Sequence, residues 1–378
     1  MVPEIDAVDV ISLAAPLDEP FGYAQAWVEE RTAVLVRITA TDGTVGWGEC
    51  WGPAAGTRET VTDFLAPRIE GKDPRAVTAI YDDLVHDARA AYQSIVPYPA
   101  ISGVDLALWD LAGKTRDEPV ASLLGSRRRE AVRAYATGHY FRHGLALEDQ
   151  FDAIATEAAG NAAALGAVKA KIGLSLLGHG PDEDVELVRR IRNAIGPDAA
   201  LMVDANYAYD AGTARRVGRA IEPLEVTWFE EPVPPADEAG YAHLREALDL
   251  RIAGGECHTP AGFDRLFKAG GLDVAQPDLC NVGGLTAATR IGHRATAAGV
   301  PVVPHVWGTG IALAASLQFI ATLPGEPWLE FDRSPNPLRT AVTRESFVPT
   351  EAGLVSIPDR PGIGITVDEG TLERYRTD

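Results

Sequence analysis

The chain has 378 residues, 46% of them apolar, and a formal net charge of −20. The length and the apolar content suit a barrel with a smaller second domain and exclude global disorder. The negative charge argues against nucleic acid or an anionic membrane as a partner, although a buried cation and local lysines would still attract a small anionic substrate.

Three cysteines, Cys50, Cys257 and Cys280, form neither a Cys-x-x-Cys pair nor a dense framework. A disulfide scaffold or a zinc ribbon is therefore not expected, and a reducing cytoplasm is the predicted location. No signal peptide is expected, because the first residues lack a basic stretch followed by an apolar one. No apolar run reaches membrane-spanning length.

The first 50 residues have the composition of β-strands. Residues 5–13 alternate loosely, and residues 32–39 are rich in β-branched side chains. An Asp-Gly turn at 41–44 predicts a hairpin that continues into residues 45–50.

Two stretches beside these strands, residues 18–27 and 50–56, combine glycine, proline and aromatic residues and are expected to be loops. One interpretation is that they are surface turns. The other is that they close over a pocket, because aromatic side chains exclude water well.

Residues 58–125 are expected to be helical, most clearly over 100–114. Four apolar residues recur there at helical spacing on one face: Ile101, Val104, Leu108 and Leu111. Strands followed by helices predict an α+β domain over residues 1–130.

From residue 131 onward, short apolar runs alternate with helical stretches, the clearest of which is 181–196. The predicted strands are residues 132–138, 168–173, 201–206, 227–230, 251–256, 273–278, 300–305 and 328–331. Eight strands separated by helices predict a barrel over residues 131–340. An open doubly wound sheet is the alternative, but its glycine fingerprint is absent. Residues 341–378 are predicted to pack back on the first domain.

Three of these strands carry a carboxylate at or near their end, Asp204, Glu230 and Glu256, each 26 residues from the next. The C-terminal ends of barrel strands converge on one mouth, where three acids would repel one another without a positive charge between them. Because hard divalent cations prefer oxygen ligands, the sequence predicts a Mg²⁺ site.

Lys169 and Lys171 lie two residues apart on one strand and therefore point the same way, into the barrel mouth. Burial and the neighbouring like charge are both expected to lower their pKa values toward the range of a general base. A Lys-x-Lys pair is more often a solvated strand face, but its position one βα unit before Asp204 favours the catalytic interpretation.

Asp278 and His305 end two further strands, 27 residues apart, which is again one βα unit. A carboxylate that accepts a hydrogen bond from one imidazole nitrogen makes the other nitrogen more basic. A satisfied core histidine is the alternative. Glu330 lies on the last predicted strand, where a protonated carboxyl group would hydrogen-bond a substrate carboxylate.

Residues 306–310 begin a helix, whose backbone N–H groups are expected to form an anion cradle. Asn206 and Trp307 are the candidate substrate contacts. Glu231 alternates away from Glu230 and is expected to support the site from behind. Five other residues are interpreted as packing cysteines or surface histidines: Cys257, Cys280, His139, His143 and His258.

Together these motifs resemble those of the enolase superfamily, in its mandelate racemase-like subgroup, over nearly the whole chain. They are K-A-K at 169–171, D-A-N at 204–206, F-E-E-P at 229–232, G-G-E at 254–256, Q-P-D at 276–278, P-H at 304–305 and L-E at 329–330. The resemblance implies an α/β fold: a modified TIM barrel, (β/α)7β, with an N-terminal α+β capping domain completed by the C-terminal tail.

The resemblance also implies roles for the candidate residues. One Mg²⁺ per subunit would bind Asp204, Glu230 and Glu256. Lys171 and the His305–Asp278 dyad would be the acid/base groups, with Lys169 assisting Lys171 and Glu330 assisting the substrate carboxylate. The muconate-lactonizing and dipeptide-epimerase subgroups use a lysine on the sixth strand, where this chain has Asp278.

The phrases at 132–138, 276–280, 304–310 and 330–337 are similar to those of galactarolactone and anhydrogalactonate cycloisomerases. This implies Mg²⁺-dependent removal of the proton α to the carboxylate of a sugar acid or lactone, through an enediolate, followed by β-elimination that opens the ring. Loss of a hydroxyl group would make the enzyme an acid-sugar dehydratase, and return of the proton a racemase or epimerase. The same residues serve all three outcomes.

Two interpretations come from outside this chemistry. A metal hydrolase barrel would usually show His-x-His on its first strand, which this chain lacks. A non-catalytic sugar-acid binder would tolerate the loss of Lys171 or His305, yet both are present. The resemblance further implies a homo-oligomer.

Overall fold

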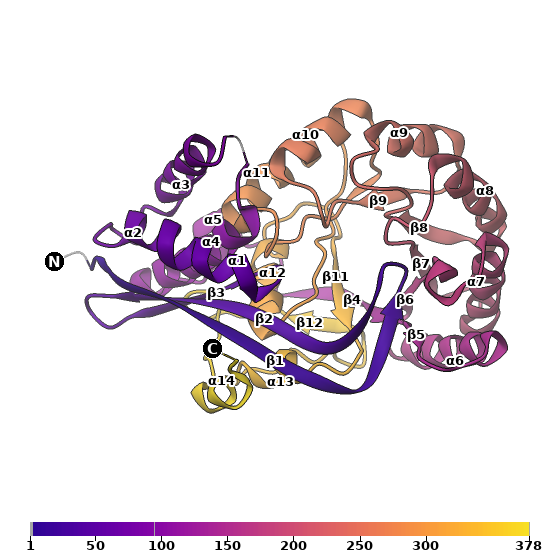
Figure 1. The fold of residues 1–378 in the computed structure, drawn as a ribbon, viewed down its shortest axis with the longest axis horizontal. Helices are drawn as coiled ribbons and strands as arrows, with labels where there is room; N and C mark the ends of the chain where they lie inside the picture. Colours follow the sequence, from indigo (N-terminus) through magenta and orange to yellow (C-terminus); the bar gives the residue numbers. More distant parts are fainter. Residues whose placement is uncertain (1–2, 94, 378) are drawn as a thin grey trace.

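The structure, a computed structural model, describes residues 3–93 and 95–377. Its N-terminal part is an antiparallel sheet with helices packed on it (Figure 1). The strands lie in the order β3 (Val45–Cys50), β2 (Ala26–Ala40), β1 (Ile5–Tyr23) and β5 (Phe141–Arg142). The helices are α1 (Ala54–Glu59), a π-helical turn (Thr60–Leu65), α2 (Ala66–Ile69), α3 (Val77–Ala91), α4 (Tyr98–Arg116) and α5 (Val120–Leu124). The predicted order of strands followed by helices is confirmed.

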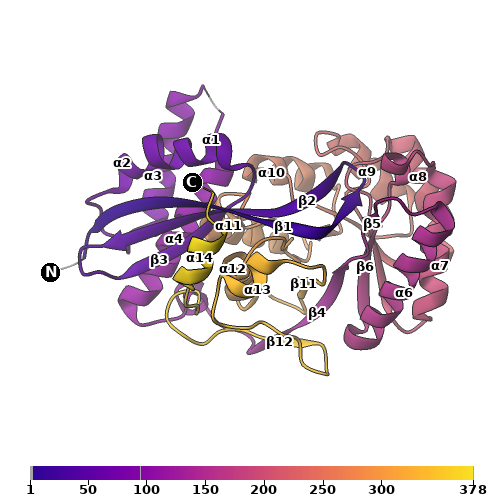
Figure 2. The same cartoon turned by 60° about the horizontal axis from the view of Figure 1, so that its bottom comes forward.

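The prediction that residues 18–27 form a loop is wrong, because most of them belong to β1 and β2. β1 and β2 form one long hairpin that turns at Ala24 and Gln25 and reaches across to the barrel (Figure 2). Pro16 pairs with Glu30 and Phe21 with Val28, so the four residues between Pro16 and Phe21 bulge out of the ladder. A bulge tolerates a proline that regular pairing would exclude, which is why the loop-like composition misled the prediction.

Helix α4 lies directly on β3 because β3 carries two glycines. A Cβ atom on Gly48 would lie 2.0 Å from the carbonyl oxygen of Gly103, and one on Gly46 would lie 2.2 Å from that of Ala107. The four apolar residues predicted to form one face of this helix are all fully buried: Ile101, Val104, Leu108 and Leu111.

The second sheet is parallel and curled, and helices α6 to α10 form an arc outside it (Figure 1). Its strands are β10 (Val274–Ala275), β9 (Ile252–Gly254), β8 (Val226–Glu230), β7 (Ala200–Asp204), β6 (Ala167–Lys171), β4 (Ala131–Gly138) and β11 (Trp328–Asp332), in that spatial order. The helices are α6 (Leu147–Leu165), α7 (Pro181–Ile195), α8 (Ala211–Ile221), α9 (Glu238–Ala247), α10 (Pro260–Ala269), α11 (Gly284–Ala297) and α12 (Gly310–Ile320), with 3-10 turns at Leu174–Leu177 and Glu222–Leu224.

The segment 300–305, predicted as a strand of this barrel, does not form a regular strand. Only Val302 forms a bridge, with Ala275. Ala275 donates to the carbonyl oxygen of Pro301, and Val303 donates to that of Ala275. Pro301 and Pro304 have no N–H to offer a ladder, so the segment keeps the position of a strand without its regular pairing.

The C-terminal residues contact both parts of the molecule. They contain α13 (Pro337–Ala341), β12 (Leu354–Ser356) and α14 (Glu369–Tyr375). β12 pairs antiparallel with β4 of the barrel, while Thr377 donates its N–H to the carbonyl oxygen of Ser12 on β1. The division of the chain at residues 130 and 340 stays a prediction. Within residues 3–93 and 95–377, no helix combines the length and the apolar composition needed to cross a membrane.

Two glycine substitutions test how tightly α4 packs on β3. Gly48→Ala is expected to lower the free energy of unfolding by about 1–3 kcal/mol or more, because the new methyl group meets backbone that cannot move away. Gly160→Ala is the matched control, since Gly160 lies in α6 with open space around its Cα and a φ that any residue adopts. It is expected to stabilise by about 0.5–1 kcal/mol. Chemical denaturation measures both, and equal effects would contradict this packing.

Candidate active site

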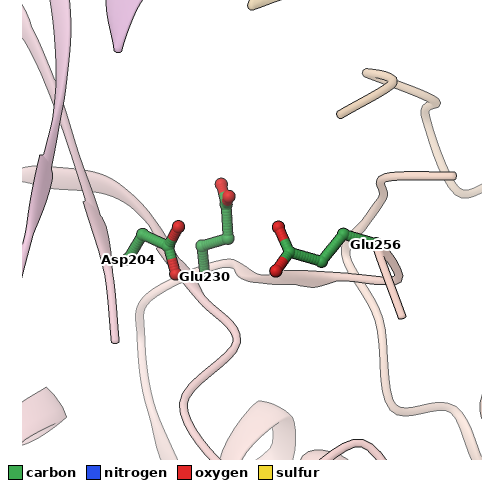
Figure 3. Close-up of side chains that lie close together, drawn as sticks. All are labelled: Asp204, Glu230 and Glu256. Carbon is green, nitrogen blue, oxygen red and sulfur yellow. The ribbon is translucent and has the colours of Figure 1, made fainter. Parts of the chain in front are cut away.

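Three carboxylates meet at the C-terminal ends of the central barrel strands (Figure 3). Asp204 ends β7, Glu230 ends β8, and Glu256 lies two residues beyond β9. One oxygen from each lies within 4.8 Å of the others. The parallel register places Asp204 directly opposite Glu230, so the strand pairing itself brings these charges together.

Neighbouring donors fix the orientation of these carboxylates. Glu230 Oε2 accepts hydrogen bonds from Trp228 Nε1 at 2.8 Å and from Gln276 Nε2 at 2.7 Å. The hydroxyl group of Tyr207 donates to Glu256 Oε1. None of these three donors was predicted from the sequence, although Trp228 lies two residues before Glu230 on the same strand face.

The donor set fits a hard divalent cation. All three acids offer oxygen, which Mg²⁺ prefers. Asn206, predicted as a substrate contact, lies between them: its N–H donates to Asp204 Oδ1 at 2.9 Å and its side-chain amide faces Glu256 at 3.5 Å. Its side-chain oxygen is buried without a hydrogen-bond partner, so the cluster has a further oxygen to offer a ligand.

Both predicted lysines enter this cluster from β6. Lys171 Nζ donates to Asp204 Oδ2 at 2.5 Å. Lys169 is fully buried and contacts Glu230, while its Nζ lies 2.7 Å from Glu330 Oε1. Burial lowers the pKa of Lys171, but Asp204, Tyr140 and Glu256 together outweigh burial and hold the pKa above its usual value. The prediction that the pKa values of Lys169 and Lys171 are lowered is therefore wrong, because adjacent strands surround both lysines with acids.

Asp278 and His305 are also brought together. Asp278 Oδ2 lies 2.6 Å from His305 Nδ1, and Glu256 Oε2 lies 3.2 Å from Nε2. Burial lowers the pKa of His305, but Glu256, Glu330 and Asp278 together raise it to about 10. The imidazole therefore links the predicted dyad to the acid cluster, and these acids favour its charged form.

Glu330 is not the neutral acid that the sequence suggested. Burial raises its pKa, but Lys169, His305 and Lys171 together outweigh burial and hold the pKa below the usual value. The N–H of Val306 also donates to Glu330 Oε2 at 3.2 Å. Glu330 is thus a charged partner of Lys169.

The helix start at 306–310 is not an open anion cradle, because the chain fills it with a carboxylate of its own. Glu49 from β3 accepts hydrogen bonds from the N–H groups of Thr309 and Ala312. Burial raises the pKa of Glu49 to about 7 against these hydrogen bonds. No signal in the sequence joins positions 260 residues apart.

A cavity of about 100 Å³ opens beside the acids. Its lining combines aromatic and apolar side chains with the charged and polar groups of the site: Phe21, Tyr23, Val28, Trp51, Tyr140, Lys171, Asn206, Glu256, His305 and Trp307. The hairpin tip and the 50–56 stretch therefore border a pocket, as one of the two interpretations expected. Trp307, the second predicted substrate contact, stands beside Trp51 with ring centroids 5.7 Å apart.

Two of the three histidines interpreted as surface residues are buried. His139 is fully buried, with Nδ1 2.8 Å from the carbonyl oxygen of Lys169, and His258 is 5% exposed against Tyr241 and Phe263. Only His143 is exposed. The prediction failed because loop position was taken to mean exposure. Cys280 is buried as expected, whereas Cys257 is exposed.

The chain matches two family models over most of its length. One is described as the mandelate racemase / muconate lactonizing enzyme N-terminal domain and covers residues 6–125. The other is described as enolase C-terminal domain-like and covers residues 153–371. The chain therefore belongs to the mandelate racemase and muconate lactonizing enzyme family of the enolase superfamily, and the predicted fold class is confirmed.

Individual relatives and solved structures extend over nearly the whole chain. It is 42% identical to D-galactarolactone cycloisomerase of Agrobacterium fabrum, over 99% of both sequences. It is 36% identical to the structure of 3,6-anhydro-D-galactonate cycloisomerase from Zobellia galactanivorans, with a TM-score of 0.88 over 99% of this chain and 100% of that one. It is 28% identical to a structure of L-talarate/galactarate dehydratase liganded with Mg and L-glucarate, with a TM-score of 0.85 over 100% and 93%.

Removal of one candidate ligand tests the metal site. At a Mg²⁺ concentration of about 100 times Kd, binding to the native state is expected to stabilise the wild-type protein by about 2.7 kcal/mol. Glu256→Gln is expected to lose most of that stabilisation, because an amide is a weaker ligand for a hard cation. Glu246→Gln removes a charge from an exposed position and is the control. Melting curves with and without Mg²⁺ measure the difference, and an unchanged Mg²⁺ response in Glu256→Gln would contradict the assignment.

His258 predicts a loss of stability in acid. Burial lowers the pKa of His258 to about 4, below its usual 6.5, so the unfolded chain binds this proton more readily. The stability that the neutral ring contributes is complete above pH 6.5 and is lost as the pH falls toward 4, by up to about 3 kcal/mol. His258→Asn removes the titrating group. Its free energy of unfolding should fall less steeply than that of the wild type between pH 6.5 and 4, and parallel curves would refute this.

Proposed function

We propose that this protein removes the proton α to the carboxylate of a cyclic sugar acid or a lactone and then opens the ring by β-elimination. One observation carries the proposal. Two groups able to move protons, Lys171 on β6 and His305 beyond β10, line one pocket and flank the acids that end β7 and β8 and follow β9. The similarity to two cycloisomerases supports the ring-opening outcome.

Asp204, Glu230 and Glu256 would hold one Mg²⁺ per subunit, which when bound polarises the substrate carboxylate and offsets the negative charge that develops on its oxygens. Lys169 adds a fixed positive charge to the same place, since it is fully buried and cannot turn away. Glu330 neutralises part of that charge and holds the ammonium group in position.

One of Lys171 and His305 takes the α-proton as a base. The electrons of the broken C–H bond form a double bond between the α- and β-carbons, and the bond between the β-carbon and the ring oxygen breaks. The other group gives its proton to the departing oxygen. Asp204 is the strongest of the groups that raise the pKa of Lys171, so sharing the charge of Asp204 with a cation would lower that pKa toward a useful range.

A second candidate, an acid-sugar dehydratase, uses the same residues and differs only in the leaving group, a hydroxyl in place of the ring oxygen. The similarity to L-talarate/galactarate dehydratase favours it, at a lower identity of 28%. Racemisation or epimerisation, in which the proton returns to the other face, and simple binding of a sugar acid are the remaining alternatives.

We also propose that the protein is a cytoplasmic homo-oligomer. Three cysteines that form no disulfide support a reducing compartment. The expectation of an oligomer rests on the family resemblance, and light scattering of the purified protein tests it.

Product analysis separates the two main candidates. The proposal expects Mg²⁺-dependent conversion of D-galactarolactone to an open-chain product without loss of water, and slow or absent turnover of galactarate. Turnover of galactarate with loss of water, together with an inert lactone, would support the dehydratase. No reaction with any aldonate, aldarate or lactone would refute the proposal.

Substitution of either proton-moving group tests the mechanism. Lys171→Ala and His305→Asn are each expected to lower kcat by about 100- to 10,000-fold, since each removes an acid/base group. Lys268→Ala removes an ammonium group from the exposed face of α10 and is expected to leave kcat unchanged. Turnover and exchange of the α-proton in D₂O measure these effects. A variant of Lys171 or His305 with near wild-type kcat would contradict the role of that residue.

A further inference from the structure

A carboxylate from the N-terminal sheet reaches into the barrel at the start of α12. Glu49, on β3, is 4% exposed. Its Oε1 accepts a hydrogen bond from the N–H of Thr309 at 3.0 Å, and its Oε2 accepts from the Thr309 hydroxyl at 2.6 Å and from the N–H of Ala312 at 3.1 Å. The unpaired N–H groups and the dipole of a helix N-terminus stabilise a negative charge at this place.

The backbone next to Thr309 leaves room for this carboxylate. A Cβ atom on Gly308 would lie 2.6 Å from Glu49 Oε1, closer than such atoms approach one another. The carbonyl oxygen of Gly308 in turn accepts a hydrogen bond from the side-chain amide of Asn336 at 3.1 Å. The path of the loop between His305 and α12 is therefore held from both sides.

Residues 49–51, which begin with Glu49, also contact the loop that carries Asp278, the partner of His305. The N–H of Trp51 donates to the carbonyl oxygen of Cys280 at 2.9 Å, and the N–H of Cys280 donates to Asp278 Oδ1 at 2.7 Å. The ring of Trp51 meets that of His305 edge to face, with centroids 5.6 Å apart. The segment thus ties the loop of Asp278 to the loop of His305.

We propose that Glu49 is a positioning residue for His305, which acts through Thr309 on the loop that connects His305 to α12. Glu49 does not line the pocket and touches no candidate metal ligand, so its effect passes through the backbone that it holds. A displacement of about 1 Å at a reacting group can cost about 100-fold in rate, so a fixed loop matters for turnover. This inference rests on the proposed function, which gives His305 its acid/base role.

The substitution Glu49→Gln tests the role at nearly constant shape. The new NH₂ group must face one of the N–H groups that the carboxylate accepted, which weakens the contact. We expect kcat to fall about 10- to 100-fold. We expect KM to stay within about threefold, because Glu49 is not itself part of the pocket lining. Glu30→Gln, at an exposed position of β2, is the matched control and should change neither constant.

A double-mutant cycle tests whether the effect passes through Thr309. Thr309→Ala removes the hydroxyl donor and is expected to lower kcat in the wild-type background but to add little to Glu49→Gln, because both changes break the same contact. Thr309→Ser keeps the hydroxyl and should restore kcat. Full additivity of the two changes, or a kcat of Glu49→Gln within about twofold of the wild type, would overturn the proposal.

A crystal structure of Glu49→Gln gives a readout that needs no substrate. The inference expects the contact of 2.6 Å between His305 Nδ1 and Asp278 Oδ2 to lengthen or the Trp51 ring to shift. Unchanged geometry at both places would overturn it. If the wild-type protein reacts with no sugar acid, the proposed function fails, while this structure still decides whether Glu49 positions His305.

Discussion

Opposite charges buried at the ends of neighbouring strands determine the rest of this site. Asp204 and Glu230 lie side by side out of water, and such a pair is tolerated only with compensating positive charge. In this structure Lys169 and Lys171 supply it. A cation bound by the same acids would therefore compete with the lysines for their charge, so the strand register would couple metal binding to lysine basicity.

The N-terminal sheet contributes to the site in two physically different ways. The tip of the β1–β2 hairpin brings Phe21, Tyr23 and Val28 to the pocket, where apolar walls exclude water and strengthen every electrostatic contact inside. The end of β3 contributes polar contacts instead: Glu49 and Trp51 bind the barrel through hydrogen bonds to its backbone. The hairpin tip thus shapes what enters the pocket, whereas β3 holds the loops that carry the dyad.

The barrel and its acids could be predicted from the sequence because both follow from a regular repeat of strands and helices along the chain. Strand-length apolar runs that end in acids every 26 residues place those acids at one end of a parallel sheet, whatever the details of the loops. The same logic placed Lys169 and Lys171 in the cluster. It also located 300–305 correctly beside β10, although two prolines prevent a regular strand there.

What the sequence could not show depends on contacts between distant residues. Composition alone made 18–27 look like a loop, since nothing local reveals that a bulge lets it pair with β2. The pKa direction of Lys171 follows from Asp204 on the next strand, and the capping of α12 follows from Glu49, 260 residues earlier. His139 and His258 have the local sequence of loop residues, and only the packing of other elements buries them.

We propose that the acid cluster binds a metal ion and a substrate carboxylate, with one proton-moving group on each side. A crystal structure of the Lys171→Ala variant with Mg²⁺ and D-galactarolactone tests it most directly. We expect Mg²⁺ on Asp204, Glu230 and Glu256, the substrate carboxylate beside it, and the α-carbon between His305 and the side vacated by Lys171. A metal ion bound elsewhere, or His305 and residue 171 on the same face of the α-carbon, would contradict it.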